Sequence, residues 1–355
     1  MKHNPFTPNG SGCAFCAIVP ISLLNRHAKD RKGTAHSRKM MRDTATETER
    51  LRSLREVHRQ NSVDTPAADA KAAAATKARE LAFDCERRNS LPGKPADKAA
   101  VAKDPAIQSV IEITARLATF YQQVLGRNSV DNAGSDLVSS VHYLVGFNNA
   151  FWNGHQMVYG DGDGQVFDDF YRAPDVIGHE LTHGLTQHES GLHYEGEAGA
   201  LNESFSDVIG ATFHQWINGW PSSREEGWLI GASILGKASR ARGKTCLRDM
   251  LHPGARHCLS QQPESYQDLD PAANVHLNSG IANKAFALFA REIGKPTWEL
   301  AALVWYQAAL SPKLKADSGF RDFARLTRVA AKSLGGAALE KKVAAAWKQV
   351  DVRSA

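Results

Sequence analysis

The sequence predicts an α+β fold, in which a mixed α/β lobe is followed by an α-helical lobe. Between residues 138 and 167, short apolar runs are separated by turns rich in Asn and Gly, which is typical of strands. From Pro174 to the end, apolar residues recur at helical spacing, over residues 281–293, 296–310 and 320–334. A chain of 355 residues, 42% of them hydrophobic, can bury one large core or two smaller ones.

The N-terminal region differs in composition from these two lobes. Residues 25–80 are rich in Arg, Lys, Ala, Thr and Glu, and carry no sustained apolar stripe beyond Leu51, Leu54 and Val57. This composition predicts a helical but weakly packed leader. The Ala-rich stretch after Asp64 is linker-like, so we expect a boundary between about residues 60 and 80.

The first lobe should begin after this linker. Residues 80–85 predict a strand, the following Ser-Leu-Pro-Gly sequence a turn, and residues 105–125 a helix. We therefore expect a leader over residues 1–65, a mixed lobe over residues 66–190 and a helical lobe over residues 191–355.

Charge and hydropathy limit the partners. The formal net charge of +5 is small for this length and the two signs are interleaved, so nucleic acid is not an implied partner. The apolar run from Cys13 to Leu24 is too short to span a bilayer, and no membrane association is expected. Pro20 interrupts this run and a basic stretch follows it. We expect a precursor made in the cytoplasm, with a cleaved signal peptide or non-classical secretion as alternatives.

The five cysteines form an odd and scattered set: Cys13, Cys16, Cys85, Cys246 and Cys258. Free thiols are the expected state. Two alternatives stay open for the Cys-x-x-Cys pair near the N-terminus, a redox pair or half of a zinc site. Cys246 and Cys258 could also pair.

A His-Glu-x-x-His string at residues 179–183 predicts a metal site. On a helix, residues four apart share a face, so His179 and His183 can bind one ion, with Glu180 alongside. Zinc needs a third protein ligand and an open position for water.

A second helical pattern supplies the missing ligand. Glu203 and Asp207 lie one turn apart on one face, about twenty residues after the histidines. We expect Glu203 to be the third ligand and Asp207 to accept the other ring N–H of a ligand histidine. Carboxylates at this spacing usually mark a solvated face, but their combination with the histidine string makes coincidence the weaker interpretation.

Three further motifs accompany these residues in order. They are Asn148-Asn-Ala-Phe-Trp-Asn-Gly, Met157-Val-Tyr-Gly-Asp-Gly-Asp-Gly and Val275-His-Leu-Asn-Ser-Gly-Ile-Ala-Asn-Lys-Ala. Together with the ligand helices they resemble the thermolysin family of metallopeptidases, over about residues 80 to 350. The resemblance implies a two-lobed fold with the zinc site in the cleft between the lobes. It also implies a monomeric endopeptidase that acts on peptides and proteins.

The resemblance also implies roles for individual residues. Glu180 takes a proton from the attacking water and returns it to the leaving amine, while Tyr194 and His276 stabilise the tetrahedral intermediate. Arg248 contacts the substrate carbonyl. The substrate binds as an added strand. The remaining substrate-binding positions are Asn149, Ala150 and Trp152 along the strand, and Phe167, Phe170, Val176 and Leu247 in an apolar pocket that favours a bulky residue after the scissile bond.

Within the family, the N-terminus looks like that of the protealysin-like subgroup. Residues 16–24, Cys-Ala-Ile-Val-Pro-Ile-Ser-Leu-Leu, keep one proline of the subgroup's Pro-Pro motif. The leader is then expected to occupy the cleft, to place Pro20 and its apolar neighbours near the zinc, and to be removed by the enzyme itself. Cys16 as a zinc ligand is the less favoured alternative.

Two departures from the family pattern matter. Pro271 stands where the family has the Asp that orients the histidine, so either Asp270 reaches His276 from one residue earlier or His276 is left unoriented. This chain also lacks the carboxylates of the family's double calcium site. The aligned positions hold His214, Gly227, Leu229 and Ala232. Calcium dependence should therefore be weak or absent. The rival hypotheses are a catalytically silent zinc-binding protein and a precursor whose leader never leaves.

Overall fold

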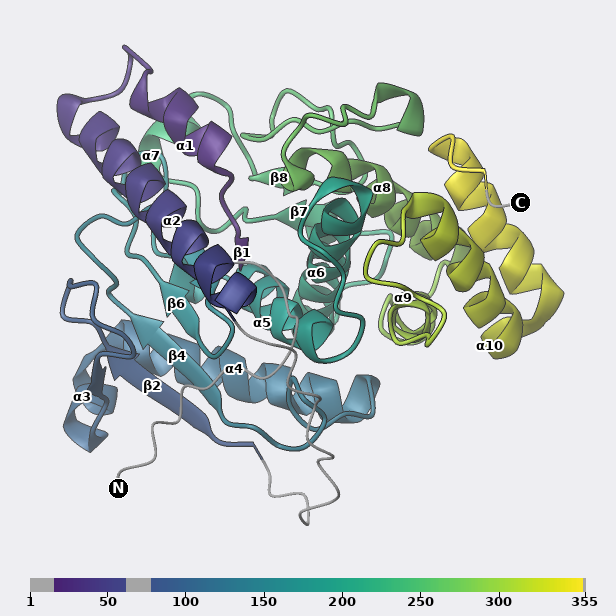
Figure 1. The fold of residues 1–355 in the computed structure, drawn as a ribbon, viewed down its shortest axis with the longest axis horizontal. Coiled ribbons are helices and arrows are strands. Elements are labelled where there is room, and N and C mark those ends of the chain that lie inside the picture. The colour runs from purple at the N-terminus through teal and green to yellow at the C-terminus, as the bar shows by residue number, and fades with distance from the viewer. Residues whose placement is uncertain (1–15, 62–77, 354–355) are drawn as a thin grey trace.

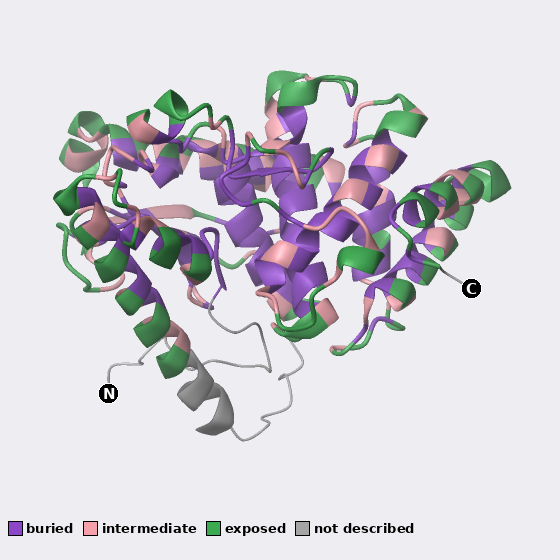
Figure 2. Ribbon diagram, turned by 90° about the horizontal axis from the view of Figure 1, so that it is seen from above, coloured by how far each residue is buried: buried purple, intermediate pink, exposed green. Residues whose placement is uncertain are grey.

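A computed structural model describes residues 16–61 and 78–353, with the side chains of 55–61 excluded (Figure 1). The predicted α+β architecture is confirmed. Figure 1 shows the sheet and α4 on one side, α8, α9 and α10 on the other, and α5 and α6 between them. The buried residues concentrate in the helices at the middle of the molecule (Figure 2). No helix in the described ranges is long and apolar enough to cross a membrane.

Six strands form the main sheet, in the order β1-β5-β6-β4-β2-β3. They are β1 (Cys16–Ala17), β2 (Glu80–Asp84), β3 (Lys94–Pro95), β4 (Leu137–Val141), β5 (Ala150–Trp152) and β6 (Met157–Tyr159). Strands β2, β4 and β6 run parallel, whereas β5 is antiparallel to β6. The edge strand β1 pairs antiparallel with β5, with Cys16 opposite Trp152 and Ala17 opposite Phe151. The N-terminal region therefore completes the sheet.

The helices of the mixed part flank this sheet. They are α3 (Lys98–Lys103), α4 (Pro105–Val124), the short η1 (Phe170–Arg172) and α5 (Pro174–His188). Asp104 caps α4, because its side chain accepts from the N–H of Ala106 at 2.8 Å and a proline occupies the first helical position. The predictions of a strand at 80–85 and a helix at 105–125 are confirmed.

The C-terminal part is helical apart from a two-stranded sheet. Its elements are α6 (Gly196–Asn218), η2 (Glu225–Trp228), β7 (Leu229–Ile230), α7 (Lys237–Ala241), β8 (Arg248–Asp249), η3 (Tyr266–Asp268), α8 (Val275–Ile293), α9 (Ala301–Ala309) and α10 (Phe320–Gln349). Trp305 stacks on Trp347, with ring centroids 5.8 Å apart and planes 9° apart. Helix α10 continues past the expected end at residue 334 through a kink, where Gly336 adopts φ 72°.

Two glycines bring α5 and α6 into close contact. A Cβ at Gly178 would lie 3.0 Å from the Cα of Gly210, and one at Gly210 would lie 2.4 Å from the carbonyl oxygen of Asp175. Any side chain at either position would push the helices apart. Glycine therefore sets the separation between the two helices that carry the candidate metal ligands.

The N-terminal helices α1 (Ile21–Ala28) and α2 (Ala35–Asn61) pack against the rest of the chain. The expectation of a weakly packed leader is wrong. One face of α2 is buried, at Ser37, Met40, Met41, Thr44, Ala45 and Thr48, whereas Leu54 is 46% exposed. Thr44 accepts from the N–H of Asn148 at 3.0 Å, and the Tyr143 hydroxyl donates to Glu47 at 2.6 Å. This stripe was missed because it consists of small, polar and Met side chains.

His142, the residue after β4, connects three segments of the chain. Its Nδ1 lies 2.7 Å from Asp161 and its Nε2 lies 3.1 Å from Asp104, the capping residue of α4. The hydrogen bond with Asp161 is the main reason that the pKa of His142 rises to about 9. The protonated imidazole therefore joins the end of β4 to two carboxylates.

Stability should fall as the pH rises because of this contact. A folded-state pKa above the unfolded value near 6.5 gives stabilisation that is complete below pH 6.5 and is lost as the pH rises through 9. We expect the free energy of unfolding by urea to drop by about 1 to 3 kcal/mol between pH 6.5 and pH 9.5. His142→Asn, which tolerates the local φ of 55°, should remove most of this drop. An equal drop in the variant would contradict the assignment.

Candidate active site

Helices α5 and α6 bring three candidate metal ligands together. The Nε2 atoms of His179 and His183 lie 3.1 Å apart, and the Glu203 carboxylate lies 3.4 Å from the first and 3.5 Å from the second. All three side chains are buried. Zinc bonds of 2.0 to 2.1 Å in a tetrahedral site place ligand atoms about 3.3 Å apart. The donor set and its spacing therefore fit zinc. Cys16 is not part of this cluster; it is disulfide-bonded, so the expectation of a free thiol is wrong for this residue.

Side chains behind the ligands fix both imidazoles. The Nδ1 of His179 lies 2.8 Å from Asp207, as the sequence predicts, and the Nδ1 of His183 lies 2.9 Å from the amide oxygen of Asn202. These contacts direct both Nε2 atoms toward Glu203. Arg248 donates twice to Asp207, at 2.7 and 2.9 Å.

The surroundings shift the pKa values of the two glutamates in opposite directions. Burial raises the pKa of Glu180 well above its ordinary value, and its carboxylate accepts from the backbone N–H of Trp152 at 3.0 Å. Burial also acts to raise the pKa of Glu203, but the neighbouring histidines outweigh it and hold the pKa well below the ordinary value. Glu203 Oε2 is buried and has no hydrogen-bond partner among the described residues. An orphaned carboxylate oxygen facing two imidazoles is what a cation would satisfy.

The N-terminal segment lies along this site as an extended strand. The N–H of Ile18 donates to the carbonyl of Ala150 at 3.1 Å. The Asn149 side chain makes two bonds to Val19, accepting from its N–H at 2.9 Å and donating to its carbonyl at 3.1 Å. Asn149 and Ala150, the residues expected to hold substrate, thus hold residues 18 and 19 by backbone contacts.

The carbonyls of this segment face the expected polar residues. His276 Nε2 lies 2.8 Å from the Ala17 oxygen, and Arg248 donates to the Ile18 oxygen at 3.0 Å. The Tyr194 hydroxyl donates to Glu203 and lies 3.3 Å from His276 Nε2. Residues 17–19 therefore contact the polar residues expected to bind substrate, and Pro20 is the N-cap residue of α1.

The Ile18 side chain is fully buried within the main hydrophobic cluster. The same cluster contains the four residues predicted to line an apolar pocket, Phe167, Phe170, Val176 and Leu247, and none of them is exposed. The rings of Phe167 and Phe170 lie 5.5 Å apart. Trp152 anchors the neighbouring strand, because its indole donates to Gln187 at 3.1 Å.

Comparison with known proteins agrees with this geometry. Residues 33–187 match the family model described as thermolysin metallopeptidase, catalytic domain, and residues 190–352 match the one described as its alpha-helical domain. The chain belongs to the thermolysin family. Members of this family are zinc metalloendopeptidases, so this chain is a hydrolase of that class.

Relatives of the thermolysin family match over most of the chain. An extracellular metalloprotease of Pectobacterium carotovorum subsp. carotovorum is 35% identical over 324 residues, covering 88% of this chain and 89% of its own. Protease PrtS of a Photorhabdus species is 36% identical over 288 residues, 76% of each chain. The solved precursor of protealysin from Serratia proteamaculans has a TM-score of 0.81 and 34% identity, covering 95% of this chain and all of its own. The chain is thus a protealysin-like member of the thermolysin family.

This thermolysin-family member does not orient His276 through Asp270, so that prediction is corrected. The His276 Nδ1 lies 2.5 Å from the Asn274 side-chain oxygen, whereas the Asp270 carboxylate accepts from the N–H of Ala272 at 2.9 Å. Asn274 also caps α8, by accepting from the backbone N–H of His276. Asn274, the residue immediately before α8, therefore orients the His276 ring in place of Asp270.

Four polar residues of the site were not foreseen: Asn202, Ser206, Asn274 and Asn283. Asn283 donates to Asp207 at 2.8 Å, and the Ser206 hydroxyl lies 3.2 Å from His183 Nδ1. A signal existed for Asn283, because it follows His276 by two helical turns and shares its face. Asn202 carried no signal beyond its place next to Glu203.

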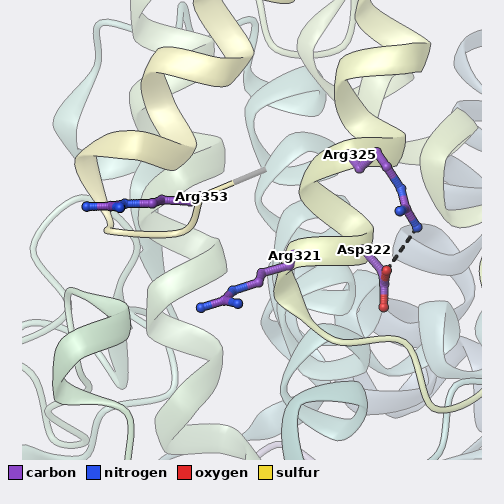
Figure 3. A pocket seen from close by; sticks show the side chains of 4 residues that line it. All are labelled: Arg321, Asp322, Arg325 and Arg353. Atoms are coloured by element: carbon purple, nitrogen blue, oxygen red, sulfur yellow. Dashed lines mark hydrogen bonds and ion pairs between the residues drawn. The ribbon is translucent and has the colours of Figure 1, made fainter. Parts of the chain in front are cut away.

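A pocket on α10 lies outside this site (Figure 3). It is lined by Arg321, Asp322, Arg325 and Arg353. Arg325 donates to Asp322 at 2.9 Å, and the Arg321 guanidinium lies over the ring of Tyr266. These side chains include neither a nucleophile nor a set of metal ligands, so we assign the pocket no role in catalysis.

Proposed function

We propose that this metalloprotease cuts peptide bonds before bulky hydrophobic residues and is made as a precursor that its own leader inhibits. The observation that carries the proposal is the path of residues 17–19. They make the backbone contacts expected of a substrate, and the buried Ile18 side chain follows the peptide bond whose carbonyl, that of Ala17, contacts His276.

The chemistry assigns one task to each residue. Zinc held by His179, His183 and Glu203 would lower the pKa of a coordinated water to about 7 and polarise the substrate carbonyl. Glu180 takes the proton of the attacking water and transfers it to the leaving amine nitrogen.

Substrate binding and oxyanion stabilisation use the polar groups that now contact the leader. Tyr194 and His276 provide donors for the developing oxyanion. Arg248 holds the carbonyl after the scissile bond, as it now holds that of Ile18. Asn149 and Ala150 hold the backbone further along the substrate.

The leader, over residues 1–65, would inhibit by occupying these same groups. Its helix α2 buries one face against the catalytic part, and β1 fills the edge of the sheet. The proposed cleavage range of about residues 55 to 80 lies mostly outside the described residues. We propose that the precursor is a cytoplasmic monomer, to be checked by gel filtration and cell fractionation.

The assay is hydrolysis of casein and of a peptide library by processed enzyme. A zinc chelator should abolish cleavage and added zinc should restore it. Cuts should fall before Leu, Ile and Phe, because burying such a side chain contributes about 1.5 to 3 kcal/mol. Cleavage mainly before Lys or Asp would rule out the proposed pocket, and zinc binding without any cleavage would favour the silent binding protein.

Calcium removal should have little effect on stability. The four positions His214, Gly227, Leu229 and Ala232 offer no carboxylate, and Asp175 already accepts from the N–H of Gly231 at 2.6 Å. A calcium ion needs six to eight oxygen ligands. We expect a calcium-selective chelator to lower the melting temperature by less than about ten degrees. A larger decrease, reversed by calcium but not by magnesium, would reveal a site elsewhere.

A further inference from the structure

A second group of soft metal ligands lies beside β8, outside the catalytic site. It consists of Cys246, His257 and Cys258, whose ligand atoms all lie within 4.8 Å of one another. Both cysteines are free and buried, and their sulfur atoms lie 3.7 Å apart. The family's expected zinc and calcium sites do not use these residues.

The backbone holds the two cysteines in register. Residues 246 and 258 form a parallel bridge, in which the N–H of Leu259 donates to the carbonyl of Cys246 at 3.0 Å. The N–H of Thr245 donates to the carbonyl of His257, also at 3.0 Å. The sulfur separation is therefore set by main-chain hydrogen bonds rather than by side-chain rotamers alone.

The spacing suits a metal better than a disulfide. Two thiolates bound to zinc at 2.3 Å in a tetrahedral site lie about 3.8 Å apart. Disulfide sulfurs lie at about 2.0 Å, so oxidation would require the two strands to approach. A disulfide would also give the nearby His257 imidazole no role as a ligand.

The His257 imidazole is paired with a carboxylate, as the imidazoles of metal-binding histidines usually are. His257 Nε2 lies 3.0 Å from Asp249, which leaves Nδ1 for a metal. Asp249 is almost fully buried, and its other oxygen accepts the N–H groups of Leu251 and His252. A carboxylate behind a ligand histidine fixes its tautomer and raises its basicity.

We propose that Cys246, Cys258 and His257 bind a second zinc ion, with water in the fourth position. Binding replaces the two thiol protons, which are released to solvent. The ion would join the two ends of residues 246–258, the segment that carries Leu247 and Arg248. Its role is thus to brace the wall of the substrate site, and it does not depend on the proposed cleavage preference.

The test is metal analysis of the reduced Glu180→Ala precursor. We expect two zinc ions per chain. Replacement of zinc by cobalt should give a near-ultraviolet sulfur-to-cobalt charge-transfer band, because the catalytic ligands are nitrogen and oxygen only. Cys246→Ser and Cys258→Ser should each keep one zinc and lose the band, and His257→Ala should weaken cobalt binding by at least about tenfold.

Two controls isolate the site. Cys85→Ser removes a buried free cysteine elsewhere, and Cys16→Ser removes the cysteine of β1; both should keep two zinc ions and the band. One zinc per chain and no band in the unmodified sequence would overturn the proposal, even if the cysteine variants fail to fold. A Cys246–Cys258 disulfide that persists under mild thiol reduction would overturn it as well.

Discussion

Glu180→Ala should lower the turnover of peptide substrates by about 10²- to 10⁴-fold while leaving zinc binding intact. The side chain is fully buried, its oxygen Oε1 has no hydrogen-bond partner among the described residues, and its other oxygen accepts from the N–H of Trp152. It is therefore available as a base without being needed as a metal ligand. Rates on a short fluorescent peptide, with zinc content measured on the same samples, check both parts.

The same variant should remain full length, because the leader is proposed to be removed by the enzyme itself. Intact mass after overnight incubation gives the result. Glu180→Gln is the matched control, since it keeps the acceptor for Trp152 and should also stay uncut. Loss of the leader from either variant at the unmodified rate, with outside proteases excluded, would mean that another protease activates the precursor.

Arg248→Ala should destabilise the precursor by about 3 to 5 kcal/mol, because it leaves the buried Asp207 carboxylate without its cation. Burial opposes ionisation of Asp207, but Arg248 and His179 overcome it and hold its pKa well below the ordinary value. The variant also lacks the hydrogen bond from Arg248 to the Ile18 carbonyl, so the leader should be held less tightly. Urea unfolding in the Glu180→Ala background measures the loss.

A double variant separates the buried charge from the lost packing. Arg248→Ala combined with Asp207→Asn removes both charges and should recover part of the stability lost by Arg248→Ala alone. Arg248→Lys keeps the charge but loses the paired hydrogen bonds. Its free energy of unfolding should lie between those of the single and the double variant. If Arg248→Ala alone loses less than about 1 kcal/mol of stability, the contacts of Asp207 with Asn283 and His179 are enough to stabilise its buried charge.

The catalytic centre was more predictable than its surroundings. His179, Glu180 and His183 share a helix, where spacing alone decides which side chains meet. The role of Asn274 was not predictable, because an Asn before a helix usually acts only as a cap. Here it both caps α8 and contacts the His276 ring.

The leader shows a different limit. Its helices could be expected from composition, but the contact between Val19 and Asn149 joins residues 130 positions apart. Such a register depends on shape across the cleft, which periodicity does not encode. The sequence indicated that Pro20 and its apolar neighbours would lie near the zinc, but not that Ala17 and Ile18 would be the residues that contact His276 and Arg248.

The strand β1 also has a consequence for solubility. While it pairs with β5, β1 covers the edge of β5 with which another chain could otherwise pair. Departure of the leader would turn β5 into an open edge that accepts any extended chain through its backbone, whether substrate or neighbour. The segment that is proposed to inhibit the enzyme would then also protect it against self-association, and a concentrated enzyme without leader or substrate should be the form most prone to aggregate.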